Sequence, residues 1–279
     1  MPTITKFDAE MISLRDLLGS HYHAIPDMQR NYEWDIAKGA MHGKNLWDNL
    51  VEFTDEDPSR SDNYYVGTMI TYKEGNKWMV IDGQQRLTTL SILFMAARDI
   101  LDTAFKNKIT GSLKINGKDV MIKSAGKELA KLTVGSPKRP RLVPKDASQK
   151  NTRAYNGYLH PLGNRPYFPK KQRHKFKVVQ AYEFFETELQ RSFPSGELHG
   201  LQSMVEFLDH LLDGIVITRT IVKDLAHGYR IFSTENTTGL KLGSIDIVRA
   251  LILAQIDRKK LHDHQDEIEA NLKDMMNNL

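Results

Sequence analysis

The stretch from residue 78 to residue 90 constrains the fold of this 279-residue chain more than any other. An apolar run typical of a β-strand, residues 78–81, ends at Asp82-Gly83. A helical pattern follows at once, because apolar residues recur every three or four positions, the period of one helix face: Leu87, Leu90, Phe94, Ala97 and Leu101. The stretch therefore predicts a strand, a tight turn and a long helix from residue 84 to about residue 105.

Three polar residues fall in the first turn of this predicted helix: Gln84, Gln85 and Arg86. A helix N-terminus attracts anions through its unpaired backbone N–H groups and its dipole, and a guanidinium with two amides adds to that attraction. The turn therefore predicts a phosphate-handling site. The alternative is structural: Asp82 caps the helix and the two glutamines are solvated.

Two other segments accompany this Asp-Gly-Gln-Gln-Arg motif, which Leu-Thr-Thr-Leu follows. Residues 25–34 read Ile-Pro-Asp-Met-Gln-Arg-Asn-Tyr-Glu-Trp, and residues 231–242 read Ile-Phe-Ser-Thr-Glu-Asn-Thr-Thr-Gly-Leu-Lys-Leu. In this order the three motifs resemble the N-terminal domain of the GmrSD-type, modification-dependent restriction endonucleases, including phosphorothioate-sensing anti-phage proteins. Two positions depart from the family pattern, since Met28 replaces a usual aromatic and Thr238 replaces a common arginine.

The resemblance, which spans about residues 10–255, implies an α+β fold. It is a small mixed sheet with helices, distantly similar to the ParB/sulfiredoxin-like fold, followed by a mainly helical part. The implied organisation is a ParB-like nucleotide-binding domain at 1–105, a basic, proline-rich insertion at 106–172 and a helical part with one buried strand at 173–279. The helical part would pack on the first domain as one unit, and the chain would stop before a nuclease domain.

The resemblance further implies an NTP-hydrolysing sensor domain of a bacterial anti-phage restriction system, using GTP or another NTP with Mg²⁺ as a candidate cofactor. Phosphoryl transfer requires positioning and charge neutralisation. Arg86 and Arg30 would neutralise phosphate charge, and Gln84 or Gln85 would hold the attacking water. Asp82 would hold a Mg²⁺-bound water or only cap the helix.

The same resemblance supplies binding residues outside the central turn. The implied nucleotide contacts are Gln29, Arg30, Gly83, Thr88 and Asn236, and the implied pocket for a soft or methyl-like DNA modification is lined by Pro26, Met28 and Gln29. For Asn236 an Asx turn is the alternative role. Two other functions stay open for the whole chain: a non-catalytic ParB-like DNA-binding module and a protein-interaction scaffold.

The net charge of +4 conceals a strong segregation along the chain. Residues 102–135 hold seven Lys/Arg against three Asp/Glu, and residues 136–177 hold twelve against one, whereas both flanks are acidic. A single-sign block with interleaved aromatics indicates nucleic-acid binding, although a solvated lysine-rich loop has the same composition. The predicted DNA contacts are Lys138, Arg139, Arg141, Lys170, Lys171, Arg173 and Lys175, with Tyr167 and Phe168 near them.

Composition excludes several classes of protein. With no cysteine there is no disulfide, no thiolate zinc site and no thiol chemistry of the sulfiredoxin kind. No apolar run approaches the roughly 20 residues of a membrane span, and the N-terminus lacks a signal-peptide core, so a cytoplasmic protein without membrane contact is expected. A P-loop motif and a nuclease motif are also absent. The expected partners are DNA, in modified form, and a nuclease domain of the longer protein or of a partner subunit; homo-oligomerisation is left open.

Periodicity places the remaining elements. Helices are expected at 8–19, 45–53, 176–189 and 201–212, with others after 225, 244 and 261. The family resemblance implies a further short helix at 146–158. Strands are expected at 21–25, in hairpins at 64–81 and 113–122, and as a buried run at 215–222. His21 and His23 alternate on the first of these strands, but no third ligand is suggested nearby, so no metal site is predicted.

Overall fold

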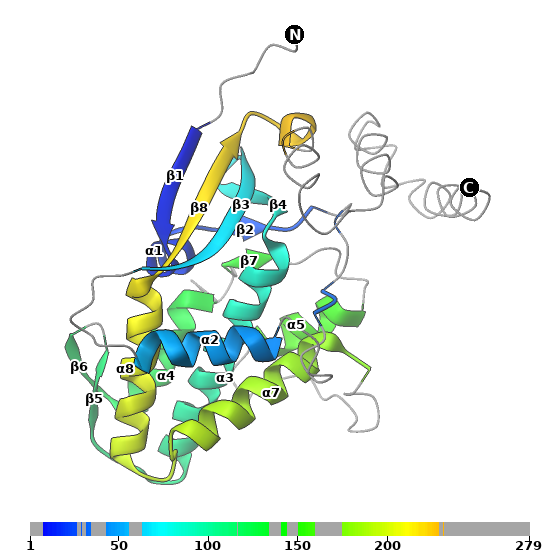
Figure 1. The fold of residues 1–279 in the computed structure, drawn as a ribbon. Helices are drawn as coiled ribbons and strands as arrows, with labels where there is room; N and C mark the ends of the chain where they lie inside the picture. The colour runs from blue at the N-terminus through cyan, green and yellow to red at the C-terminus, as the bar shows by residue number, and fades with distance from the viewer. Residues whose placement is uncertain are drawn as a thin grey trace.

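The computed structural model describes residues 8–26, 29, 32–34, 43–55, 63–115, 117–133, 141–143, 150–159, 175–228 and 231. It has a mixed α/β fold, so the expected α+β class is confirmed (Figure 1). The strands are β1 Asp8–Ser13, β2 His23–Ala24, β3 Tyr64–Glu74, β4 Lys77–Asp82, β5 Ser112–Ile115, β6 Lys118–Met121, β7 Leu142–Val143 and β8 Ile215–Val222. The helices are α1 Leu14–Ser20, α2 Gly43–Asp55, α3 Gln84–Lys106, α4 Ile122–Thr133, α5 Lys150–Leu159, α7 Lys177–Ser192 and α8 Leu198–Gly214.

Six strands form one mixed sheet in the order β1-β8-β3-β4-β2-β7, and β5 with β6 forms a separate hairpin. Strand β8 lies between β1 and β3, antiparallel to the first and parallel to the second. Strand β4 is antiparallel to β3 and parallel to β2. The carboxyl ends of β2 and β4 therefore lie side by side at the same end of the strands. The chain continues from β2 into the first motif and from β4 into the second. Because β7 and β8 belong to this sheet, it contains strands from all three segments of the predicted domain division. The division itself stays a prediction.

The main core lies between one face of the sheet and the helices, which fill the lower part of Figure 1. Strand residues such as Met69, Val80 and Ile217 join the same buried cluster as α3, α7 and α8. A smaller cluster, including Ile70 and Ile81, covers the opposite face. Helix α3 runs from the carboxyl end of β4 down into the helical body, and all of its residues from Leu87 to Leu101 are buried. Helix α3 therefore begins where the strands end, and the rest of the helix lies in the core.

Most of the expected elements are confirmed, with shifted ends. The β3–β4 hairpin, helix α3, the β5–β6 hairpin, helices α7 and α8 and the buried strand β8 all lie where periodicity placed them. The expected helix at 8–19 is wrong: residues 8–13 form β1, and only 14–20 are helical. Its apolar spacing fits a helix, but pairing of Asp8–Ser13 with β8 along a complete antiparallel register outweighs local preference.

Helix α4 is an element that sequence reasoning missed. Its buried residues Ile122, Ala125 and Leu129 have helical spacing, but lysines and a central glycine interrupt the apolar pattern. Gly126 is needed for packing, because a Cβ there would lie 2.2 Å from Oδ1 of Asp102 and 3.2 Å from the carbonyl oxygen of Arg98. The glycine thus lets α4 pack closely on α3.

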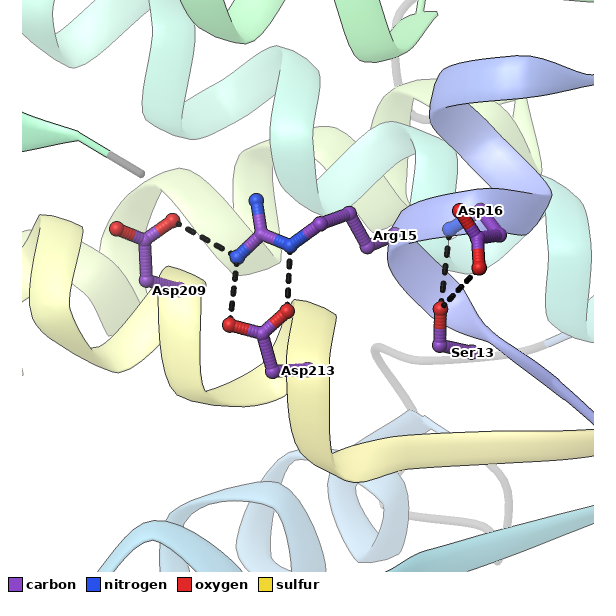
Figure 2. Close-up of polar contacts among 5 residues, drawn as sticks. All are labelled: Ser13, Arg15, Asp16, Asp209 and Asp213. Atoms are coloured by element: carbon purple, nitrogen blue, oxygen red, sulfur yellow. Dashed lines mark hydrogen bonds and ion pairs between the residues drawn. The ribbon is translucent and has the colours of Figure 1, made fainter. Parts of the chain in front are cut away.

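Helix α1 is attached to α8 by an ion pair drawn in Figure 2. The guanidinium of Arg15 donates from Nε to Oδ1 of Asp213 at 2.5 Å and from Nη2 to Oδ2 at 2.8 Å, with Asp209 further away. These acceptors raise the pKa of Arg15. Ser13 caps the start of α1 by accepting from the backbone N–H of Asp16 at 3.1 Å. Since Asp213 is largely exposed, the ion pair contributes about 1 kcal/mol or less.

Strand β2 carries a buried histidine, His23, which is 1% exposed. Burial is the main cause that lowers its pKa to about 3, and the positive charges of nearby His21, Arg219 and Arg141 act in the same direction. In the unfolded chain a histidine takes up its proton near pH 6.5. Between pH 6.5 and pH 3 the unfolded state therefore binds one more proton than the folded state, and this residue's contribution to stability is lost as the pH falls through that window.

We expect the free energy of unfolding to fall less steeply below pH 6.5 when His23 is replaced by leucine. The difference in slope should approach about 1.4 kcal/mol per pH unit at its steepest, the linkage value for one proton. Urea unfolding at pH 7, 6, 5 and 4 measures it, with His199→Gln, at an exposed position on α8, as the control. Parallel curves for parent and His23→Leu would contradict the assignment.

Candidate functional site

The turn between β4 and α3 depends on the left-handed conformation of Gly83. This residue, not Asp82, occupies the N-cap position of α3, with φ at +88° and no side-chain cap. A Cβ at this position would lie 3.1 Å from Cγ of Met69 on the neighbouring strand β3. Both the backbone conformation and the close packing therefore favour glycine. The half-buried side chain of Asp82 lies one position earlier, at the end of β4.

Both glutamines of the motif are buried, with exposures of 6% for Gln84 and 7% for Gln85. The amide nitrogen of Gln84 donates to Oε1 of Gln29 at 3.2 Å. The side-chain oxygen of Gln85 accepts from the backbone N–H of Glu33 at 3.0 Å. The alternative in which these glutamines are solvated first-turn residues is therefore wrong. They connect the start of α3 to the segment of the first motif.

Two further hydrogen bonds hold the first motif on the strand and helix of the second. Nε2 of Gln29 donates to the carbonyl oxygen of Ile81 at 2.6 Å. The hydroxyl groups of Tyr32 and Thr89 lie 2.8 Å apart, and Thr89 donates to the carbonyl oxygen of Gln85 at 2.8 Å. Burial raises the pKa of Tyr32, so its hydroxyl stays neutral. Residues more than fifty positions apart thus meet at the carboxyl ends of β2 and β4.

Arg86 is the half-buried cation of this turn. Its Nη1 donates to the carbonyl oxygen of Thr68 on β3 at 3.1 Å. The guanidinium lies over Gly67, where an added Cβ would come within 2.7 Å of Nη1. Gly67 has φ at +104° and sits in a bulge, since the register between β3 and β8 shifts between Tyr65 and Thr68. A bulge of this kind redirects nearby side chains, and here it makes room for the guanidinium.

Sequence reasoning missed the β3 side of the site, which Tyr65, Gly67 and Thr68 form. Tyr65 is 53% exposed and its hydroxyl lies 3.2 Å from Oγ1 of Thr68. The available signal was Gly67 itself, because an isolated glycine in a strand pattern indicates a bulge or a close approach of another group. Which group approaches could not be read from that signal.

The remaining predicted residues have different surroundings. Pro26 and Thr88 are buried, Arg141 is half-buried and Lys175 is exposed just before α7. The predicted residues that lie outside the described part of the chain are Met28, Arg30, Lys138, Arg139, Tyr167, Phe168, Lys170, Lys171, Arg173 and Asn236.

The described residues were also compared with two other kinds of site, a metal site and a surface groove. These residues contain no group of three or more His, Cys, Asp or Glu side chains arranged to hold a metal ion. A groove of about 550 Å³ is lined by Asp48, Glu52 and Asp55 of α2 with Arg191 of α7. It includes none of the predicted site residues.

The comparison with known families concerns the same residues. A model of the GmrSD restriction endonuclease N-terminal domain matches residues 14–253, which include all three motifs and the turn before α3. The chain belongs to this family. A search of curated proteins found no match. Within the described part of the structure, no helix is both long enough and apolar enough to cross a membrane.

Membership of the GmrSD family assigns the chain to a restriction endonuclease system, as the resemblance implied. It also explains why the first and second motifs occur together. In the structure the side chains of Gln29, Gln84 and Gln85 link them directly, so the two motifs lie together at the start of α3.

Proposed function

We propose that this GmrSD domain is an NTP-hydrolysing sensor of an anti-phage, DNA-modification-dependent restriction system. Nucleotide turnover at the start of α3, together with modified-DNA sensing, would control a nuclease domain of the longer protein or of a partner subunit. The observation that carries the proposal is the geometry of Arg86: a half-buried guanidinium held by Thr68 in the first turn of a 23-residue helix.

The proposed role of Arg86 is to bind the phosphates and neutralise charge that develops during transfer. The helix dipole and the backbone N–H groups at the N-terminus of a helix attract the same phosphates. Because most of α3 is fixed in the core, this end needs little reorganisation when the nucleotide binds, which is the condition for electrostatic catalysis. Arg30, in the first motif, is proposed as a second phosphate contact, and Asn236 as a contact from the third motif.

The hydrogen bonds of the two glutamines support a positioning role for them, ahead of the water-binding role that the resemblance implied. Gln84 and Gln85 bind Gln29 and the backbone of Glu33, so we assign them first to positioning the first motif against α3. Holding the attacking water would be a further task of the Gln29–Gln84 pair. On this assignment the DNA modification would be sensed close to the phosphates of the bound nucleotide, by Pro26, Met28 and Gln29.

The residues present fit Mg²⁺ with a nucleotide, but not an all-protein metal site. Mg²⁺ usually takes one or two carboxylates together with substrate phosphates and waters. Asp82, half-buried at the end of β4, is the carboxylate next to the turn, and the described residues form no larger ligand group. Bound Mg²⁺ would supply charge neutralisation. Asp82 would orient a water of its coordination shell.

The test is release of inorganic phosphate from GTP, ATP, CTP and UTP by the purified chain in the presence of Mg²⁺. Each nucleotide is tested alone and with duplex DNA that carries a phosphorothioate or a modified cytosine. Turnover that rises on addition of modified DNA supports the sensor function. No turnover under any of these conditions would reject it in favour of a non-catalytic DNA-binding module.

A glycine substitution tests the position of Arg86 without removing the residue. In Gly67→Ala the new methyl group would overlap the guanidinium, and we expect Arg86 to leave Thr68 and phosphate release to fall by at least about tenfold. The matched control is Gly75→Ala, where φ is also positive, at +58°, but nothing lies within 4 Å. Gly75→Ala should lose about 1 kcal/mol of stability to backbone strain, and Gly67→Ala should lose more, because its φ lies outside the left-handed region that L residues adopt. Equal activity in the two variants would contradict the role of the guanidinium.

A further inference from the structure

Helix α4 presents a row of lysines to solvent. Lys123, Lys127 and Lys131 are exposed and recur every four residues, so they lie along one face. The opposite face, with Ile122, Ala125 and Leu129, is buried. At a rise of 1.5 Å per residue the row spans about 12 Å from the first lysine to the last.

Arg141 extends this row beyond the end of the helix. Its Nε donates to the carbonyl oxygen of Lys131 at 3.2 Å, and its backbone N–H donates to the carbonyl oxygen of Thr133 at 3.0 Å. Its guanidinium also lies over the ring of Tyr22, 4.7 Å from the centroid. We name Lys123, Lys127, Lys131 and Arg141 the α4 basic row.

Few acidic side chains offset the α4 basic row. Between residues 103 and 133 the chain carries seven lysines against Asp119 and Glu128. Glu128 pairs with Lys131, whose side chain is still 63% exposed. Asp102, between α3 and α4, is half-buried and its pKa is raised chiefly by burial, while Lys106 and Lys127 act in the opposite direction. Lysines of α3 and α4 therefore share one side of the helix pair.

We propose that the α4 basic row binds the phosphate backbone of duplex DNA. A duplex carries one phosphate per 3.4 Å of helix axis on each strand, and each strand winds around that axis, so a straight row of about 12 Å can face about two to three phosphates of one strand. Lysine acts as a point charge without base readout, so this contact fixes the position of the duplex and carries no sequence information. The inference rests on the proposed function, since it names the surface that would place the DNA for modification sensing.

The experiment measures binding of a fluorescein-labelled 24-bp duplex, about two turns, by anisotropy between 50 and 200 mM salt. Replacing Lys123, Lys127 and Lys131 together by alanine should reduce the slope of log K against log salt by about two to three, close to 0.9 for each phosphate that is no longer neutralised. Affinity at 50 mM salt should fall at least about tenfold, equally for modified and unmodified duplexes. Circular dichroism checks that α4 stays folded.

The matched control removes three lysines elsewhere: Lys73, Lys77 and Lys223, in the β3–β4 hairpin and after β8. It changes net charge by the same amount and should leave the slope unchanged. Equal slopes for the two triple variants, or no effect of the α4 variant, would overturn the proposal. Equally tight binding of polyglutamate would overturn it too and reassign the row to an acidic protein.

A parent chain that binds no duplex DNA overturns this inference while leaving the nucleotide site to be judged by phosphate release. Conversely, a chain without NTP turnover whose salt slope depends on the α4 basic row would retain the DNA surface and lose the proposed enzyme. The two failures are therefore distinguishable.

Discussion

Replacing Arg86 by alanine is expected to reduce NTP turnover by about a factor of 10³, because removal of a group that neutralises developing phosphate charge typically has an effect of that size. The fold should persist, since the guanidinium is half-buried and its hydrogen bond to the carbonyl oxygen of Thr68 joins it to a strand that β4 and β8 already hold on both sides. Phosphate release, calibrated on the parent rate, measures the effect, and circular dichroism checks the fold.

Two companion variants make the Arg86 result specific. Arg86→Lys keeps the charge but loses the planar guanidinium, so it should recover only part of the activity. Arg191→Ala removes an arginine whose side chain is 71% exposed at the end of α7 and should keep the parent rate. A folded Arg86→Ala protein with parental turnover would reject the assignment of the site to the start of α3.

Replacing Arg98 by alanine should give the largest loss of stability, about 3–5 kcal/mol, because it leaves a buried carboxylate without its cation. Arg98 is fully buried; its Nε donates to Oδ1 of Asp99 at 2.9 Å and its Nη2 to the carbonyl oxygen of Tyr158 at 2.8 Å. Oδ2 of Asp99 accepts from the hydroxyl of Tyr182 at 2.8 Å. This network joins α3 to α5 and α7.

Thermal and urea unfolding would measure the loss, with a fall in Tm of about 2–4 °C per kcal/mol for a chain of this size. Replacing both residues, as Arg98→Met with Asp99→Leu, should recover much of it, because apolar pairs of similar volume often substitute for a buried ion pair. Arg15→Ala, which breaks the half-exposed pair with Asp213, should lose about 1 kcal/mol or less. Equal losses for Arg98→Ala and Arg15→Ala would contradict a special role of the buried network.

The three motifs and the turn before α3 were predictable because their signals are local. A strand that ends at Asp-Gly and continues as a helical pattern can form only a tight turn with the helix N-terminus beside it, and β4, Gly83 and α3 have this arrangement. The hairpins and the buried strand β8 were predictable for the same reason, since their turn residues and β-branched runs act over a few positions.

Other outcomes depended on contacts between distant residues. Residues 8–13 form a strand because β8, some 200 positions later, offers a paired edge. The helix α4 was missed because Gly126 weakens the helical pattern, and the reason for a glycine exists only where α4 packs on Asp102 of α3. In both cases the deciding interaction has no trace in the local sequence.

The same distinction applies to the candidate site. The sequence by itself determined that Gln84, Gln85 and Arg86 open a long helix, because periodicity and the Asp-Gly turn are properties of neighbouring residues. Only the tertiary structure decided what each does: the glutamines are buried against the first motif, and Arg86 lies over Gly67 on β3. The physical reason is that burial and hydrogen-bond partners come from other strands, whose position a one-dimensional pattern does not contain.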